Sequence, residues 1–139
     1  MSRSGYIDYD ENDPGFARWR GAVSKAINGR RGQAFLREML AALDAMPEKE
    51  LIAAELVSED GAVCAIGAIC KARGMDVSNI DEGDGEDVGD AVGIARAMAM
   101  EIAYINDECG PAKWQGEETP AQRFERVRRW VVAKLKVAP

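Results

Sequence analysis

The stretch AVGIARAMAMEIAYIN, residues 91–106, decides the fold of this chain. Its apolar residues surround almost the whole circumference of a helix, which is typical of a helix inside a fold and not on its surface. Gly93 and the many alanines let neighbouring helices approach closely. The segment carries Arg96 and Glu101 and is too short to cross a bilayer. We therefore expect it to be the central helix of a helical domain.

Four further helices are predicted around this central one, because apolar residues recur at helical spacing. They cover residues 14–28, 31–46 and 66–73, and a last helix begins at residue 120. Asp13-Pro14 and Thr119-Pro120 are the clearest starts, since each pairs a capping side chain with a proline at the first helical position. Gln122 completes a capping box with Thr119.

Residues 51–64 differ from the helical segments. LIAAELV and AVCA read as two short strands around SEDG, where Gly61 tolerates the positive φ of a tight turn. A helix is the alternative, because LIAAEL also suits one. We expect a mainly α fold of about five helices around the central apolar helix, with a short β-hairpin near residues 51–64 and an α+β class as the alternative.

The domain organisation follows from length and composition. A chain of 139 residues with a hydrophobic fraction of 47% fits one domain with its own core. Residues 1–12 are polar and read as an N-terminal arm, and residues 13–139 as a single helical domain. The N-terminus lacks the apolar core of a signal peptide and no apolar run suits a membrane span, so we expect a cytoplasmic protein without membrane contact.

Charge is sorted along the chain although the net charge is −6. Residues 16–37 hold six bases and no acid, residues 44–118 hold eighteen acids against five bases, and residues 119–139 hold six bases against Glu125 alone. These segments either attract one another within the fold or present charged faces to a partner. Self-association through opposite charges is a further alternative.

The acidic run between residues 75 and 90 has seven acids and no base, and we expect an exposed loop there. It does not fit a calcium-binding loop. Placing Gly85 at the sixth position of an EF-hand puts Ile80 at the first and Ala91 at the twelfth, where oxygen ligands are needed. Acids just before a helix are better explained by the positive end of its dipole. No metal ligands and no cofactor are predicted.

The chain has no histidine and three cysteines. The absence of histidine excludes serine and cysteine hydrolases that rely on an imidazole base. If Cys64 and Cys70 share a helix, they lie too far apart to form a disulfide, and buried free thiols are expected. Catalysis by carboxylates, with or without a cation in the loop at 76–90, is the weaker hypothesis, and a protein without enzymatic activity is favoured.

Four runs together resemble a family of small proteins encoded by tailed phages and prophages of proteobacteria. The runs are GRRGQAFLREMLAALDAMPEKELIAAEL (29–56), EDGAVCAIGAICKARGMDVSNID (59–81), GIARAMAMEIAYINDE (93–108) and ETPAQRFERVRRWVV (118–132). The resemblance implies a phage accessory protein working in the host cytoplasm and not a part of the virion. It carries over no catalytic or binding residue.

Two functions are preferred over a carboxylate enzyme and over a self-associating scaffold. The favoured one is a non-enzymatic binder or inhibitor of a host or phage protein, for example a host defence or replication factor. The alternative is nucleic-acid binding, in which basic helices contact phosphates, although the acidic middle of the chain would repel a polyanion. The candidate partner-binding residues are Arg30, Arg31, Arg123, Arg126 and Arg129, and the nucleic-acid alternative adds Arg128.

Overall fold

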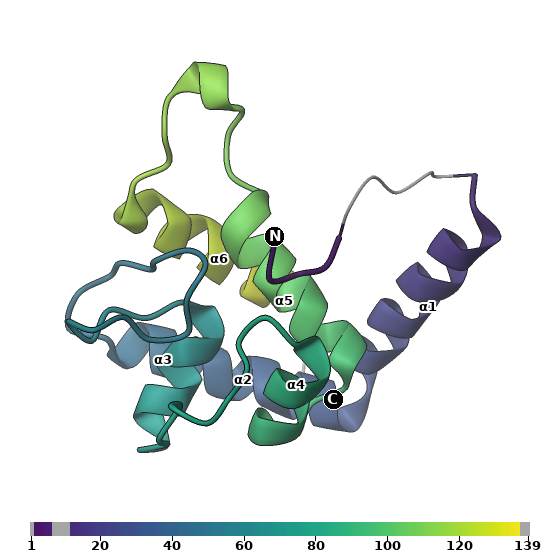
Figure 1. Ribbon diagram of the computed structural model, residues 1–139, viewed down its shortest axis with the longest axis horizontal. Helices are drawn as coiled ribbons and strands as arrows, with labels where there is room; N and C mark the ends of the chain where they lie inside the picture. The colour runs from purple at the N-terminus through teal and green to yellow at the C-terminus, as the bar shows by residue number, and fades with distance from the viewer. Residues whose placement is uncertain (1, 7–11, 137–139) are drawn as a thin grey trace.

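The computed structural model describes residues 2–6 and 12–136, in which the chain folds into six α-helices and one short 3-10 turn (Figure 1). The helices are α1 (Pro14–Asn28), α2 (Arg30–Ala45), α3 (Ala65–Ala72), α4 (Gly85–Val92), α5 (Arg96–Glu108) and α6 (Pro120–Lys134), and the turn is η1 (Lys113–Gln115). The described residues contain no β-strand, only one isolated bridge, so the mainly α class is confirmed.

The predicted helix starts hold because they depend on local capping. The Asp13 carboxylate accepts from the Gly15 N–H at 2.8 Å, and Pro14 is the first residue of α1. Thr119 and Gln122 form the reciprocal capping box at the start of α6. Each cap satisfies N–H groups that the helix itself cannot.

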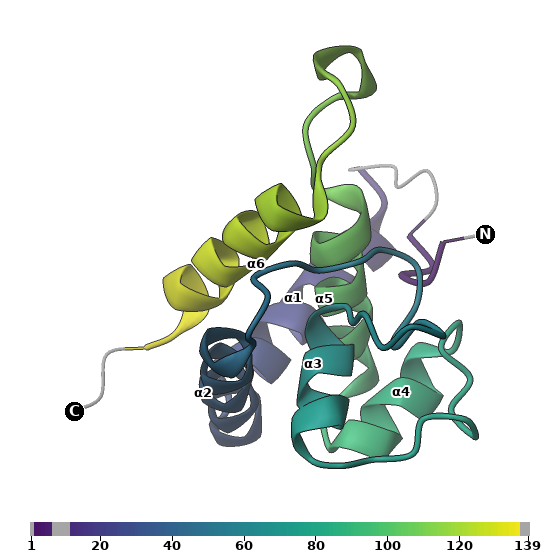
Figure 2. The ribbon, with the colours of Figure 1, turned by 90° about the vertical axis from the view of Figure 1, so that its left-hand side faces the viewer.

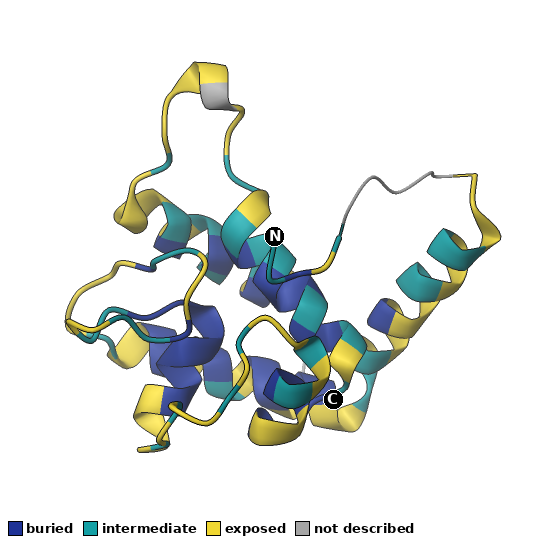
Figure 3. Ribbon diagram, in the orientation of Figure 1, coloured by how far each residue is buried: buried dark blue, intermediate teal, exposed yellow. Residues whose placement is uncertain are grey.

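Helix α5 occupies the centre of the fold and contacts α1, α3, α4 and α6. Met98, Ala99 and Ile102 are buried along it, and the buried residues of the other helices face the same interior (Figure 3). The prediction of a central apolar helix is therefore confirmed. No helix within the described ranges combines the length and apolarity that a membrane crossing requires.

The predicted start of the central helix at residue 91 is wrong, because the chain breaks there into two helices. Gly93 takes a left-handed conformation with φ of 89°, and both its N–H and that of Ile94 donate to the Gly89 carbonyl. These bonds end α4 and turn the chain into α5. The acidic run is also only partly a loop, since α4 begins at Gly85 behind the cap of Asp84.

The β-hairpin predicted at residues 51–64 is wrong, and so is the helical alternative. The tight turn exists, with Gly61 at φ of 86° and Ser58 N–H donating to Ala62 O, but only Val57 and Val63 form a bridge. Other backbone groups of the segment bond elsewhere: Leu51 N–H to Pro120 O, Ala54 N–H to Asp107 and Leu56 N–H to Glu82. Between the two arms, Ile52 N–H also donates to Val63 O and Cys64 N–H to Leu56 O, but these bonds do not form a regular ladder.

The first residues of the expected N-terminal arm lie against α5. Arg3 forms a two-point ion pair with Asp107, with N–O distances of 2.7 and 2.8 Å, and Ser4 is fully buried and donates to Glu108 at 2.6 Å. Part of the arm, residues 7–11, is outside the described residues. The linker from α5 to α6 projects from the helices instead (Figure 2), and its Trp114 is 84% exposed.

Candidate partner-binding surface

Three helix ends meet at a corner of the molecule. Helix α1 ends at Asn28, and α2 begins two residues later. The buried amide of Gln33 then joins them to the end of α6: its Nε2 donates to Ile27 O at 2.9 Å and to Lys134 O at 3.0 Å, and its Oε1 accepts from Lys136 N–H at 2.8 Å. The basic segment at 16–37 and the basic segment at 119–139 thus become neighbours, although Gln33 and Lys134 are 101 residues apart in the sequence.

Exposed cations gather at this corner. Its members, which we call the basic corner, are Lys25, Arg30, Arg31, Lys134 and Lys136. Lys136 donates to Asn28 O at 2.8 Å, whereas no described carboxylate lies within ion-pair distance of any of the five. Unneutralised charges of one sign on neighbouring elements create a local positive potential. The basic corner is therefore suited to an anionic surface.

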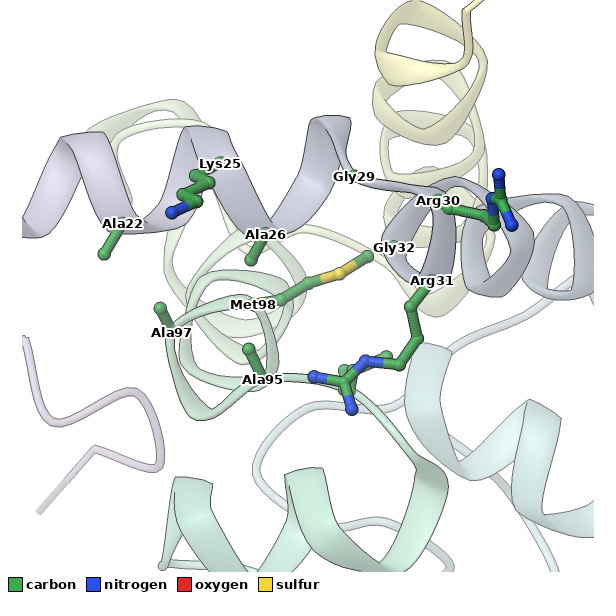
Figure 4. Close-up of a pocket in the computed structure, with 11 residues that line it drawn as sticks. Ala22, Lys25, Ala26, Gly29, Arg30, Arg31, Gly32, Ala95, Ala97 and Met98 are labelled. Carbon is green, nitrogen blue, oxygen red and sulfur yellow. The ribbon is translucent and has the colours of Figure 1, made fainter.

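An open hollow of about 400 Å³ adjoins the basic corner, between α1, the start of α2 and the start of α5 (Figure 4). Alanines form much of its wall, with Met98 at its inner side; the alanines are Ala22, Ala26, Ala95 and Ala97. The Arg31 side chain extends from α2 towards Ala95, while Arg30 points away from it (Figure 4). The hollow therefore combines an apolar wall with a cationic rim.

Close approach of α1 and α2 shapes this hollow. A Cβ on Gly32 would lie 2.0 Å from the carbonyl oxygen of Ala26 and 3.0 Å from that of Ile27. Atoms that are not bonded do not approach so closely. Only glycine lets the first turn of α2 rest on the last turn of α1, so Gly32 is a structural requirement of the corner.

Two helix N-termini open on the hollow without capping side chains. The caps of α2 and α5 are Gly29 and Ala95, neither of which offers a side-chain acceptor, and neither first turn contains an acid. By contrast, α1, α3, α4 and α6 each have a side-chain cap. The partial positive charge of an uncapped helix start adds to that of the basic side chains.

The remaining predicted partner-binding residues lie on α6, away from the hollow. Arg126 forms a two-point pair with Glu118, at 2.6 and 2.9 Å, and donates to the carbonyls of Ile105 and Asn106 at the end of α5. Arg123 is half-buried, donates to Leu51 O at 3.1 Å, and its Nε lies 3.4 Å from Glu118. Arg123 and Arg126 therefore make intramolecular contacts within the fold.

Arg129 is exposed on α6 and has no ion pair with any described carboxylate. The five predicted residues are therefore not one site: Arg30 and Arg31 belong to the basic corner, and Arg123 and Arg126 to an internal network. The sequence prediction passed over the lysines of the basic corner. Lys25 lies in the acid-free run at 16–37, which was a usable signal, whereas nothing local placed Lys134 and Lys136 beside it.

A second polar network joins the N-terminal residues to the core. Glu101 is 4% exposed and accepts two hydrogen bonds from Arg20, at 2.7 and 2.8 Å, and one from the Tyr6 hydroxyl at 3.0 Å. Tyr6 in turn accepts from Trp19 Nε1 at 2.9 Å, and burial raises the pKa of its hydroxyl. Because these groups satisfy one another, the network serves to hold α1 and the N-terminal residues on α5.

The residues around the hollow include no carboxylate, thiol or hydroxyl group, so they present binding groups and no pairing of nucleophile with base. Across residues 2–6 and 12–136 no three acidic or cysteine side chains lie close enough together to hold a metal ion. Comparisons with protein-family models, curated proteins and solved structures find no match to this chain. The basic corner and its hollow are the surface from which a role can be argued.

Proposed function

We propose that the chain is a non-enzymatic binding protein whose basic corner holds an acidic surface of a partner protein. The observation that carries the proposal is the gathering of five cations from α1, α2 and the C-terminal end of α6 at one corner, without neutralising carboxylates among the described residues. Three of them, Lys25, Arg30 and Arg31, line an open hollow. Interfaces arrange charges so that a positive patch meets a negative one, which accelerates encounter and selects the partner.

Six arginines outside the basic corner are paired within the fold, which supports the same proposal. Ion pairs hold Arg3, Arg20, Arg73, Arg123, Arg126 and Arg128 to carboxylates of the chain. Each of these charges is therefore neutralised within the fold. The five cations of the basic corner have no such carboxylate partner among the described residues, so their charge is available for recognition.

A protein partner fits this surface better than nucleic acid. Helix α4 carries Glu86, Asp87 and Asp90 and packs on α5, whose first turn lines the hollow. Carboxylates on that side repel an extended polyanion, and the net charge of −6 adds to the repulsion. A folded partner can instead present acidic groups to the basic corner alone.

The resemblance to small proteins of tailed phages and prophages adds context to the proposal. In that context the partner is a protein of the bacterial host or of the phage, met in the host cytoplasm, and binding modulates or inhibits it. Small size and a surface suited to binding agree with such a role.

The test compares three forms of the protein as baits in a bacterial lysate, followed by mass spectrometry. The first is the wild type and the second carries R30E and R31E, which add favourable charge at a helix start and should leave the fold intact. The third carries R18E and K71E, the same change in net charge at exposed positions on α1 and α3.

The proposal expects one protein that the wild type and the R18E/K71E control retain and the R30E/R31E variant loses. Retention by all three forms would contradict binding through the basic corner. Recovery that disappears after nuclease treatment would replace the protein partner with nucleic acid.

A further inference from the structure

We infer that the hollow beside the basic corner receives one aromatic side chain of the partner, from a segment that carries carboxylates on either side of it. This inference rests on the proposed function and adds the chemistry of the recognised segment. It depends on two properties of the hollow that occur together, an apolar wall of small residues and a cationic rim.

The apolar wall selects a flat hydrophobic group. Ala22 on α1 and Ala95 and Ala97 near the start of α5 contribute only methyl groups, which leaves room between the two helices. Met98 lies fully buried behind this wall, so the surface that an inserted group would touch is formed by the alanine methyl groups. An inorganic anion would leave this apolar surface without a use, so the occupant has to include a hydrophobic side chain.

The cationic rim selects the groups around that side chain. Lys25 and Arg31 reach the hollow from α1 and α2 and have no carboxylate partner among the described residues (Figure 4). They can pair with carboxylates that flank an inserted ring, or lie over its face, where a cation is attracted to the π electrons. A purely aliphatic segment would leave both charges unpaired, and a basic segment would be repelled.

The test uses two synthetic peptides and fluorescence anisotropy. One peptide has a single phenylalanine between runs of glutamate, and the other has alanine in its place. The wild-type protein should bind the phenylalanine peptide about tenfold more tightly, since burying part of an aromatic side chain provides that factor. R31E should weaken the binding of both peptides.

A variant that fills the hollow separates the contribution of the phenylalanine ring to binding from the contribution of the glutamates. Ala22 is exposed on α1 and lines the hollow, so A22L should remove the preference for phenylalanine while glutamate-driven binding persists. The matched control is A17L, at an exposed position of the same helix that does not line the hollow, and it should keep the preference.

The outcomes separate this inference from the proposed function. Equal binding of both peptides by the wild type overturns the inference and leaves binding of an acidic partner standing. Absence of any peptide binding also overturns it, while the lysate comparison still decides the proposed function. A preference that survives in A22L overturns the hollow as the place of insertion. Self-association that W114A abolishes would assign the hollow to the exposed Trp114 of a second copy, and would also overturn the inference.

Discussion

Replacing Gly32 with alanine should open the corner between α1 and α2, on which the basic corner depends. The new Cβ would lie 2.0 Å from Ala26 O and 3.0 Å from Ile27 O, so α2 has to move by roughly 1 Å or more to reach ordinary contact distances. Because the obstructing atoms are backbone carbonyls of a packed helix, no side chain can rotate away to relieve the clash.

The expected cost follows from three contributions. Overpacking between two helices costs about 3 kcal/mol, at the upper end of the usual range. Weakening the Gln33 hydrogen bonds that join α2 to α1 and α6 costs about 1 kcal/mol more, and the better helix propensity of alanine offsets about 1 kcal/mol. G32A should therefore lose about 3 kcal/mol of unfolding free energy, which lowers the Tm by about 10 °C.

Urea unfolding followed by circular dichroism measures this loss, and G21A is the matched control. Gly21 lies in the exposed part of α1 with nothing within 4 Å of a Cβ placed on it, so G21A should raise the unfolding free energy by about 0.5–1 kcal/mol through helix propensity. If G32A unfolds at the same urea concentration as the wild type, the argument from close helix approach is refuted.

Three further predictions concern other parts of the fold. Hydrogen bonds from Arg126 hold the pKa of Glu118 below its ordinary value of 4.5, so the stabilisation from this pair is present above pH 4.5 and is lost as the pH falls through the lowered pKa. E118Q should show a smaller loss of unfolding free energy between pH 7 and pH 3 than the wild type, and an equal loss would exclude the pair as a cause. T119A removes one half of the capping box of α6 and should lower the unfolding free energy by about 1 kcal/mol in urea titrations, unless the helix start is held by packing alone. Cys109 is only half-buried whereas the other two cysteines are buried, so a thiol reagent should label it first in the native protein, and simultaneous labelling of all three in peptide mapping would contradict the burial.

Most helix positions could be predicted because their signals are local. Aspartate or threonine before proline satisfies the first N–H groups of a helix whatever the rest of the chain does, and α1 and α6 begin where those pairs predict. The break at Gly93 was missed because the apolar pattern continues through it. Glycine in the middle of an apolar run is compatible with a buried helix as well as with a left-handed end.

The segment at 51–64 could not be predicted from local pattern for a different reason. Its alternating and apolar residues suit a strand, yet three of its N–H groups donate to Glu82, Asp107 and Pro120, far away in the sequence, and few bonds join its two arms. A hairpin forms only if its own backbone groups are the best partners available. In this segment, other parts of the fold supply the hydrogen-bond partners of several backbone groups.

For the candidate surface, the sequence by itself determined that cations are concentrated in two segments, at 16–37 and 119–139, and that no imidazole chemistry exists. Only the tertiary structure decided which cations are available. It bound Arg123 and Arg126 to Glu118 and to the chain, and it brought Lys134 and Lys136 to Arg30 through Gln33. The physical reason is that a charge is a property of its residue, whereas its neutralisation depends on which distant groups the fold places within a few ångströms.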